Sequence, residues 1–150
     1  MYKWIARRKA AGVFEALSEG RWRDTLGDIA PDVHHRFPGD NALGGERHSR
    51  DAMERWFERL FTVFPDLSFE VENVSVKGPP WDMWVAIEWI DRATPADGSQ
   101  YANRGSHWIR LERGKATHIH AYLDAEPVSE VCRRLADQGI AEAAAAPITD

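Results

Sequence analysis

Residues 67–124 decide the fold, and their sequence is LSFEVENVSVK-GPP-WDMWVAIEWIDRAT-PADGSQ-YANRGSHWIRLE-RG-KATHIHAYLD, with hyphens at the predicted turns. The stretch contains four runs rich in β-branched and aromatic residues, which is typical of strands. Glycine and proline mark the first two turns, and Arg113-Gly114 is short enough for a tight hairpin. The sequence therefore predicts a meander of four antiparallel strands, at residues 67–77, 81–94, 101–112 and 115–124.

Upstream of the meander, the pattern changes to helical periodicity. Ala10, Val13, Phe14 and Leu17 recur at helical spacing and predict a helix that stops at Gly20. A short helical turn follows and ends before Pro31, residues 32–37 alternate like a strand, and residues 40–48 are predicted to form a loop.

The clearest helix is predicted between Ser49, which can cap its N-terminus, and Pro65, which ends it. A last helix is expected from about Pro127 to Gly139, followed by a frayed alanine-rich tail at residues 140–150. Helices segregated from a meander define an α+β domain. We expect a strongly curved, mostly antiparallel sheet wrapped around the N-terminal helices, with a cavity between them.

Composition limits the class of protein. A chain of 150 residues with 43% hydrophobic and 29% charged residues is expected to form a single globular domain, with a core at about residues 5–138. A net charge of −5 argues against a nucleic-acid partner, since binding to phosphates needs a basic face. The single cysteine, Cys132, excludes an internal disulfide. No signal peptide or membrane-spanning segment is recognised, so a cytoplasmic location is expected.

Strand parity predicts which polar side chains face the cavity. The set Val85, Ile87, Trp89, Asp91 is apolar up to its last member and is placed inward. The same alternation turns His107 inward on the next strand and His35 inward on the first, and these three polar residues become the catalytic candidates. A histidine on an apolar face titrates near neutrality and can move protons. The predicted pocket residues are Phe14, Leu17, Phe37, Trp56, Leu60, Phe64, Trp89, Asn103, Ile119 and Leu123.

The alternation turns His118, His120 and Tyr122 outward. An H-x-H pair can bind a metal, but no third ligand is evident in the sequence, so a solvated or dimer-facing pair is expected. We expect no metal and no cofactor. Exposed aromatic side chains on the outer strand face, among them Trp84 and Trp108, predict a homodimer.

Several segments together resemble the SnoaL-like polyketide cyclases, members of the nuclear transport factor 2-like superfamily that also includes ketosteroid isomerase and limonene epoxide hydrolase. They are VHHRFPG at 33–39, SRDAMERWF at 49–57, FPD at 64–66, VAIEW at 85–89, HWIRL at 107–111 and YLD at 122–124. The resemblance implies a cone-shaped α+β barrel. This fold hosts isomerases, dehydratases, cyclases, hydrolases and non-catalytic binders, so it does not assign a reaction.

The resemblance also bears on the site residues. The position of His107 matches an oxyanion-hole acid of ketosteroid isomerase, whereas Phe14 and Phe37 occupy the positions of its tyrosine and its aspartate, which argues against that mechanism. The acid that SnoaL-like cyclases carry in the last strand corresponds either to Ala121 or to Asp124, and Asp124 is therefore a fourth catalytic candidate.

Three functions follow from these expectations. The leading one is a cofactor-independent enzyme that transfers a proton next to a carbonyl on a polyketide-like or other cyclic small molecule, as in cyclisation, isomerisation or dehydration. The second is a carrier that binds a hydrophobic small molecule in the same cavity without chemistry. The third is a structural dimer whose cavity is filled by its own side chains.

Overall fold

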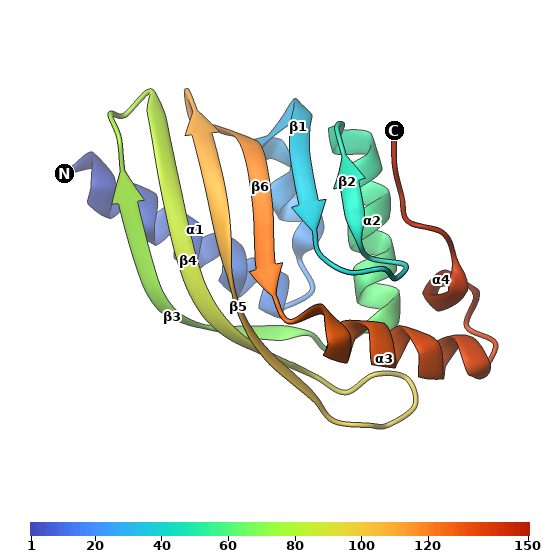
Figure 1. Ribbon diagram of the computed structural model, residues 1–150. Coiled ribbons are helices and arrows are strands. Elements are labelled where there is room, and N and C mark those ends of the chain that lie inside the picture. Colours follow the sequence, from blue (N-terminus) through green and yellow to red (C-terminus); the bar gives the residue numbers. More distant parts are fainter.

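A bent sheet of six strands forms one wall of the molecule, and helices cover its concave side (Figure 1). The structure is a computed structural model that describes all 150 residues. The spatial order of strands is β2-β1-β6-β5-β4-β3. Their bounds are β1 Ile29–Phe37, β2 Gly45–Arg47, β3 Ser68–Lys77, β4 Asp82–Ala93, β5 Tyr101–Glu112 and β6 Lys115–Leu123.

The predicted meander is present, with each of its strands within a residue or two of the predicted bounds. All neighbouring strands are antiparallel except β1 and β6, which run parallel. Arg113 and Gly114 both have positive φ angles, 52° and 81°, as the tight β5–β6 hairpin requires. The predicted α+β fold with a strongly curved sheet is confirmed, and the sheet has two free edges, β2 and β3, so it is unclosed.

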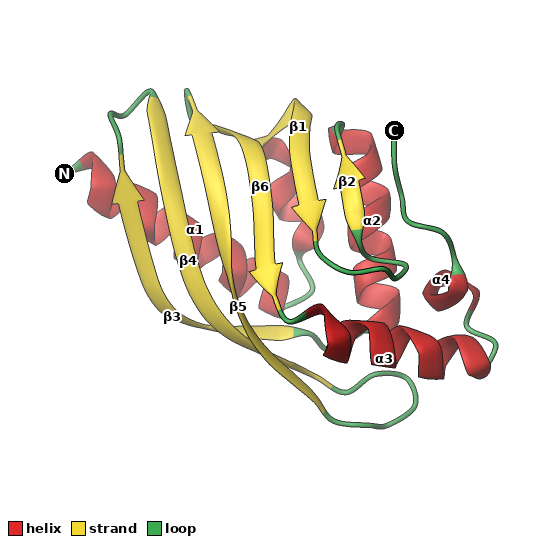
Figure 2. Cartoon of the chain, viewed as in Figure 1, coloured by secondary structure: helices red, strands yellow, loops and turns green.

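Helices α1 (Tyr2–Ser18) and α2 (Arg50–Val63) lie behind the sheet in Figure 2, on its concave side, with the short 3-10 helix η1 (Trp22–Asp28) between them in sequence. Ser49 caps α2 by accepting a hydrogen bond from the backbone N–H of Ala52. Both helices bury an apolar stripe against the strands. Together with the sheet they enclose one continuous hydrophobic core.

Two expectations about irregular segments are wrong. The segment 40–48 contains β2, which pairs with the end of β1 through Arg36 and Glu46. The tail 140–150 is packed rather than frayed: it forms α4 (Ala141–Ala144), and Ile148 is buried. Its backbone carbonyl oxygens accept hydrogen bonds from buried arginine side chains, and a sequence pattern does not show such contacts over about 100 residues.

The last long helix, α3 (Ala125–Asp137), lies across the lower end of the sheet in Figure 1. Asp124 caps it by accepting a hydrogen bond from the backbone N–H of Glu126. None of the helices combines the length and the apolar character that crossing a bilayer requires.

Candidate active site

A cavity lies between the concave face of the sheet and the helices α1 and α2. Its volume is about 130 Å³, and it is open to the surface at one side. Of its 29 lining residues, 23 are hydrophobic, so any ligand must be largely apolar. Lys9 and Asp28, half exposed and joined by an ion pair of 2.9 Å, place its rim between α1 and η1.

Most residues predicted for the site line this cavity. They are His35, Asp91 and His107 among the catalytic candidates, and Phe14, Leu17, Phe37, Trp56, Leu60, Phe64, Trp89, Ile119 and Leu123 among the pocket candidates. Two predicted residues do not line it. Asp124 caps α3, and Asn103 donates hydrogen bonds to the Asp124 carbonyl oxygen and the Tyr101 hydroxyl. Both serve the junction between β5 and α3.

His107 and Trp89 form a polar pair on neighbouring strands. Trp89 lies diagonal to His107 across β4 and β5, and its indole Nε1–H donates to His107 Nδ1 over 2.9 Å. Gly105 makes room for this contact. A Cβ atom there would lie 2.8 Å from the Trp89 ring and 2.6 Å from the Tyr122 carbonyl oxygen. The small residue therefore allows the indole to reach across β5.

The hydrogen bond from Trp89 fixes the tautomer of His107. An indole N–H only donates, so the imidazole nitrogen that receives it carries no proton, and the neutral ring holds its proton on Nε2. No protein group accepts from His107 Nε2, although the residue lines the cavity. Burial lowers the pKa of His107 to about 4. At pH 7 the ring is therefore a neutral hydrogen-bond donor aimed at the cavity, and not the proton acceptor that a lone inward histidine suggests.

Burial raises the pKa of the Asp91 carboxyl group, whereas it lowers the pKa of His107. Asp91 is buried at the far end of β4, and its Oδ1 has no hydrogen-bond partner in the protein. Burial raises the pKa of Asp91 to about 7, although the Tyr101 hydroxyl and the backbone N–H groups of Asp91 and Asn103 oppose the rise. A carboxylic acid with a pKa near neutrality can both accept and return a proton, which is what a general base needs.

Tyr101 was not among the predicted site residues. It lies on the inward face of β5 near Asp91 and lines the cavity. Burial and the Asp91 carboxyl raise the pKa of Tyr101, so its hydroxyl stays protonated. The period-2 alternation that places His107 inward also places Tyr101 inward, and this was the available signal.

His35 is the third polar group on the cavity wall. It is fully buried, and its Nδ1 is bonded to the Arg47 guanidinium, which also donates to the carbonyl oxygens of Gly44 and Ile148. Burial, followed by the Arg47 charge, holds the pKa of His35 well below its usual range. His35 is thus a second neutral imidazole with its proton on Nε2. Arg47 was missed because β2 was expected to be a loop.

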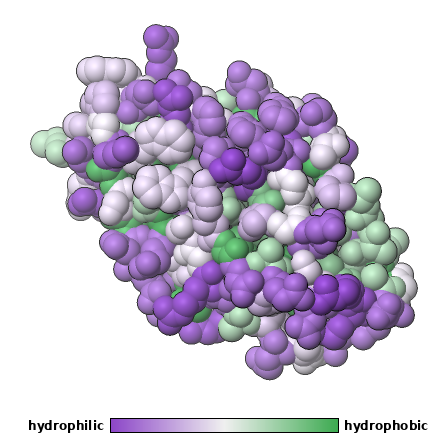
Figure 3. All heavy atoms as spheres, in the orientation of Figure 1, coloured by the Kyte–Doolittle hydropathy of each residue, from purple (hydrophilic) through white to green (hydrophobic).

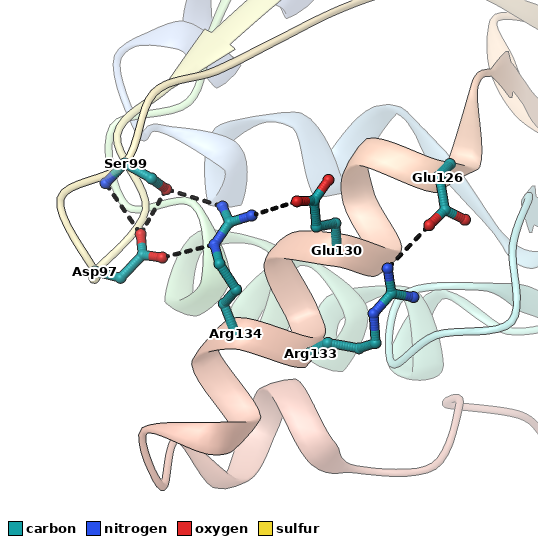
Figure 4. Close-up of polar contacts among 6 residues, drawn as sticks. All are labelled: Asp97, Ser99, Glu126, Glu130, Arg133 and Arg134. Atoms are coloured by element: carbon teal, nitrogen blue, oxygen red, sulfur yellow. Dashed lines mark hydrogen bonds and ion pairs between the residues drawn. The ribbon is translucent and has the colours of Figure 1, made fainter.

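The loop between β4 and β5 closes the Asp91 end of the molecule and is fastened to α3 (Figure 4). Arg134 donates to the Asp97 carboxylate over 2.9 Å and to the Ser99 hydroxyl over 3.0 Å, while Glu130 pairs with Arg134 from the same helix. The Ser99 hydroxyl and Arg134 hold the pKa of Asp97 down at about 2. Since Val128 of α3 lines the cavity, this helix supports both the loop and the cavity wall.

The distance between the two main polar groups limits what can touch both. Asp91 is paired with Asn103, which is four residues from His107 along β5, so their backbones lie about 13 Å apart at 3.3 Å per residue. The Trp89 ring lies between these two levels. A ligand that reaches both groups must extend past Trp89, which favours a ring system or a conjugated chain over a single small group.

This chain belongs to the SnoaL-like domain family, whose model matches residues 10–119. No protein of curated function matches its sequence. The fold is similar to that of an NTF2-like protein of unknown function from Burkholderia pseudomallei, with 19% identity, 83% of this chain and 95% of that chain covered, and a TM-score of 0.74.

Two further solved structures carry names that suggest an activity. A proposed polyketide cyclase from Xanthomonas campestris is 16% identical, with 96% of this chain and 100% of that chain covered and a TM-score of 0.62. AclR, a proposed hydroxylase from Streptomyces galilaeus, is 22% identical, with 88% and 97% covered and a TM-score of 0.65. At these identities the likeness establishes the fold, and the reaction must be argued from the site.

Proposed function

We propose that the protein is an enzyme that transfers a proton next to a carbonyl group on a hydrophobic ring compound, without a cofactor in the cavity. One observation carries the proposal: a buried carboxyl group with a free oxygen and a pKa near 7 shares an apolar cavity with a neutral imidazole donor. Pairs of groups whose environments push their pKa values in opposite directions are typical of acid–base sites.

In this mechanism the Asp91 carboxylate accepts a proton from a carbon conjugated to the carbonyl group. The electron pair of the broken C–H bond moves through the conjugated system to the carbonyl oxygen, which becomes an enolate. The Nε2–H of His107 donates to that oxygen and stabilises the negative charge that develops on it. Asp91 then returns the proton to another carbon of the conjugated system. In ring closure, the enolate carbon attacks a second carbonyl, the electron pair of that C=O bond moves to its oxygen, and Asp91 gives its proton to the resulting alkoxide.

Neutral donors suit this task. A neutral imidazole stabilises the enolate without itself surrendering a proton to it, and a site with few waters strengthens the hydrogen bond. His35 provides a second donor of the same kind on the neighbouring part of the wall. The base and the donor contact different ends of the ligand, so the charge must pass through conjugated bonds between them.

The cavity walls define the substrate class. Aromatic and aliphatic side chains surround the polar groups, and Phe14 lies with its ring edge-on to His107 at 5.3 Å. Such walls favour flat apolar rings. Structures with the same fold include TerC co-crystallised with polyporic acid, at a TM-score of 0.68 and 18% identity, and the proposed polyketide cyclase. These neighbours support a cyclic, carbonyl-bearing ligand.

The test is solvent exchange on a model ketone. The bicyclic enone Δ1,9-2-octalone, whose γ-carbon is conjugated to the carbonyl through the ring double bond, is incubated in D₂O with the protein. Loss of the γ-proton signals is followed by NMR. The wild type is expected to accelerate exchange. Asp91→Asn should reduce the acceleration by on the order of 10²–10⁴-fold, and His107→Phe by about 10²–10³-fold. Asp40→Asn and His118→Gln, which change the same residue types outside the cavity, should have no effect.

Two results would contradict the proposal. Equal exchange rates in the wild type and Asp91→Asn would remove Asp91 from the chemistry. Saturable binding of cyclic ketones, measured by quenching of tryptophan fluorescence, without faster exchange across a panel of such ketones would favour the carrier, the second function that the apolar cavity supports.

A further inference from the structure

Four of the six histidines gather on the outer face of the sheet, opposite the cavity. His34 on β1 is directly paired with His118 on β6, and the alternation of the strands turns both outward together with His120. The His34 ring stacks on His48, just beyond β2, at 4.8 Å and an interplanar angle of 7°. It also meets the rings of His120 at 5.0 Å and His118 at 5.9 Å.

Within this cluster, three residues bring possible metal ligands together. One nitrogen of His34, one nitrogen of His48 and one carboxylate oxygen of Glu46 all lie within 4.8 Å of one another. His34 Nε2 and Glu46 Oε1 are 3.6 Å apart. Ligand atoms of a tetrahedral zinc ion are separated by about 3.4 Å at bond lengths near 2.0–2.1 Å. A metal lies in the plane of each imidazole that binds it, so the exposed His48 ring must rotate out of its stack with His34 for both nitrogens to reach one ion.

The polar atoms at this place are unsatisfied without a ligand. His34 Nε2 and His120 Nε2 are both shielded from solvent, yet neither has a hydrogen-bond partner in the protein. A shielded polar atom without a partner is unfavourable, and each such atom calls for an explanation. A cation bound by His34 would satisfy its nitrogen. His118 differs, because its Nδ1 is already in contact with the Thr117 hydroxyl at 3.1 Å.

The surrounding residues hold the three side chains in position. Arg36 lies 3.9 Å from Glu46 and donates to the Tyr122 hydroxyl over 2.7 Å. The backbone N–H of His48 donates to the Asp150 carboxylate over 2.6 Å. Two carboxylates, of Glu46 and Asp150, lie in this region, and the arginines Arg36, Arg47 and Arg55 face them. The proposed site therefore rests on the ligand geometry and not on a net negative charge.

We propose that His34, Glu46 and His48 form a binding site for a zinc-type divalent cation, next to His120 and with one position left open to water. Two imidazoles and one carboxylate are a donor set that zinc uses in proteins, with a fourth position open. His34 lies in β1, Glu46 lies in β2, and His48 follows the end of β2. The sequence does not show that these residues are neighbours, because only the pairing of β1 with β2 brings them together.

The site is separate from the cavity. His34 and His35 are consecutive in β1 and point to opposite faces of the sheet, so the sheet itself separates the cation from the polar residues of the cavity. A negative result for the cation site therefore does not contradict the proposed enzyme activity of the cavity, and the reverse also holds.

The experiment uses the full chain without an affinity tag, stripped with a chelator and dialysed. Zinc is titrated calorimetrically, and Co²⁺ is added in parallel because its visible absorption reports the ligand geometry. One cation per chain is expected. His48→Ala and Glu46→Gln change exposed residues and should weaken binding by on the order of 10–100-fold or more, because even the loss of groups that only orient ligands has that effect.

The matched control is His118→Ala, which removes a histidine of the same cluster outside the proposed ligand set and should leave the affinity within a few-fold of the wild type. Circular dichroism confirms that each variant is folded. Absence of stoichiometric binding in the wild type would overturn the proposal. So would zinc binding that is lost in His118→Ala but kept in His48→Ala.

Discussion

Asp91 should make the protein less stable as the pH rises, and replacing it should remove that loss. The folded-state pKa of about 7 lies above the usual aspartate value of 3.8, because burial disfavours the carboxylate. At about 1.4 kcal/mol per pKa unit, this difference corresponds to roughly 4 kcal/mol. For an acid whose pKa is raised on folding, the folded state binds more protons. Stability therefore falls as the pH rises from 3.8 to 7 and is constant above.

The perturbation is Asp91→Asn, which resembles the protonated acid in shape and cannot ionise. Near pH 4 the variant and the wild type should differ little. At pH 8 the variant should be more stable by up to roughly 4 kcal/mol, although the change removes the proposed base. Such a gain is the reverse of what most core substitutions give. It would show that this carboxyl group is retained for a reason other than stability.

The assay is urea denaturation at a series of pH values, followed by tryptophan fluorescence. Taking the difference between the wild type and the variant at each pH cancels the contribution of all other titrating groups. Asp40→Asn, on the exposed loop after β1, is the matched control, because it makes the same chemical change at a carboxyl group outside the cavity. Stability curves of the wild type and Asp91→Asn that run parallel from pH 4 to pH 8 would refute the argument.

Three more predictions follow from other contacts. In ¹⁵N NMR spectra at pH 7, His107 should be neutral with its proton on Nε2 and should titrate only near pH 4; a proton on Nδ1 would contradict the bond from Trp89. Deleting residues 146–150 leaves buried arginine N–H groups without acceptors, so the free energy of unfolding should fall by about 1–3 kcal/mol per lost hydrogen bond. An unchanged melting temperature would show that the tail does not stabilise the fold. We propose that the protein forms a homodimer through its outer face, where Trp108 is 41% exposed. Sedimentation should then give a dimer for the wild type and a monomer for Trp108→Glu. A monomeric wild type at micromolar concentration would refute this proposal.

The outer face itself shows why a partner is proposed there. Figure 3 views the molecule from the side of the sheet, and pale rings of intermediate hydropathy lie over the strands among hydrophilic side chains. Trp84, Trp108 and Tyr122 line a shallow hollow on this face together with Lys77 and His120. Aromatic rings with a polar rim are typical of protein interfaces.

The sequence alone determined the meander and the long helix α2. Strands β3 to β6 were predicted nearly to the residue because alternation and turn residues are local signals, and the cap at Ser49 is local as well. The inward parity of Trp89, Asp91 and His107 followed from the same alternation. These signals fixed which residues share the concave face, and hence most of the cavity wall.

Tertiary structure decided what those residues can do. Only the diagonal contact across β4 and β5 shows that Trp89 fixes the tautomer of His107, which changes its role from base to donor. The packed tail and the pairing of β2 with β1, which place Arg47 behind His35 and Glu46 beside His34, join parts of the chain that no periodicity connects. Hydrogen-bond partners and burial set the protonation state of a side chain, and both depend on contacts distant in sequence, so the chemistry of this site lies in the folded molecule.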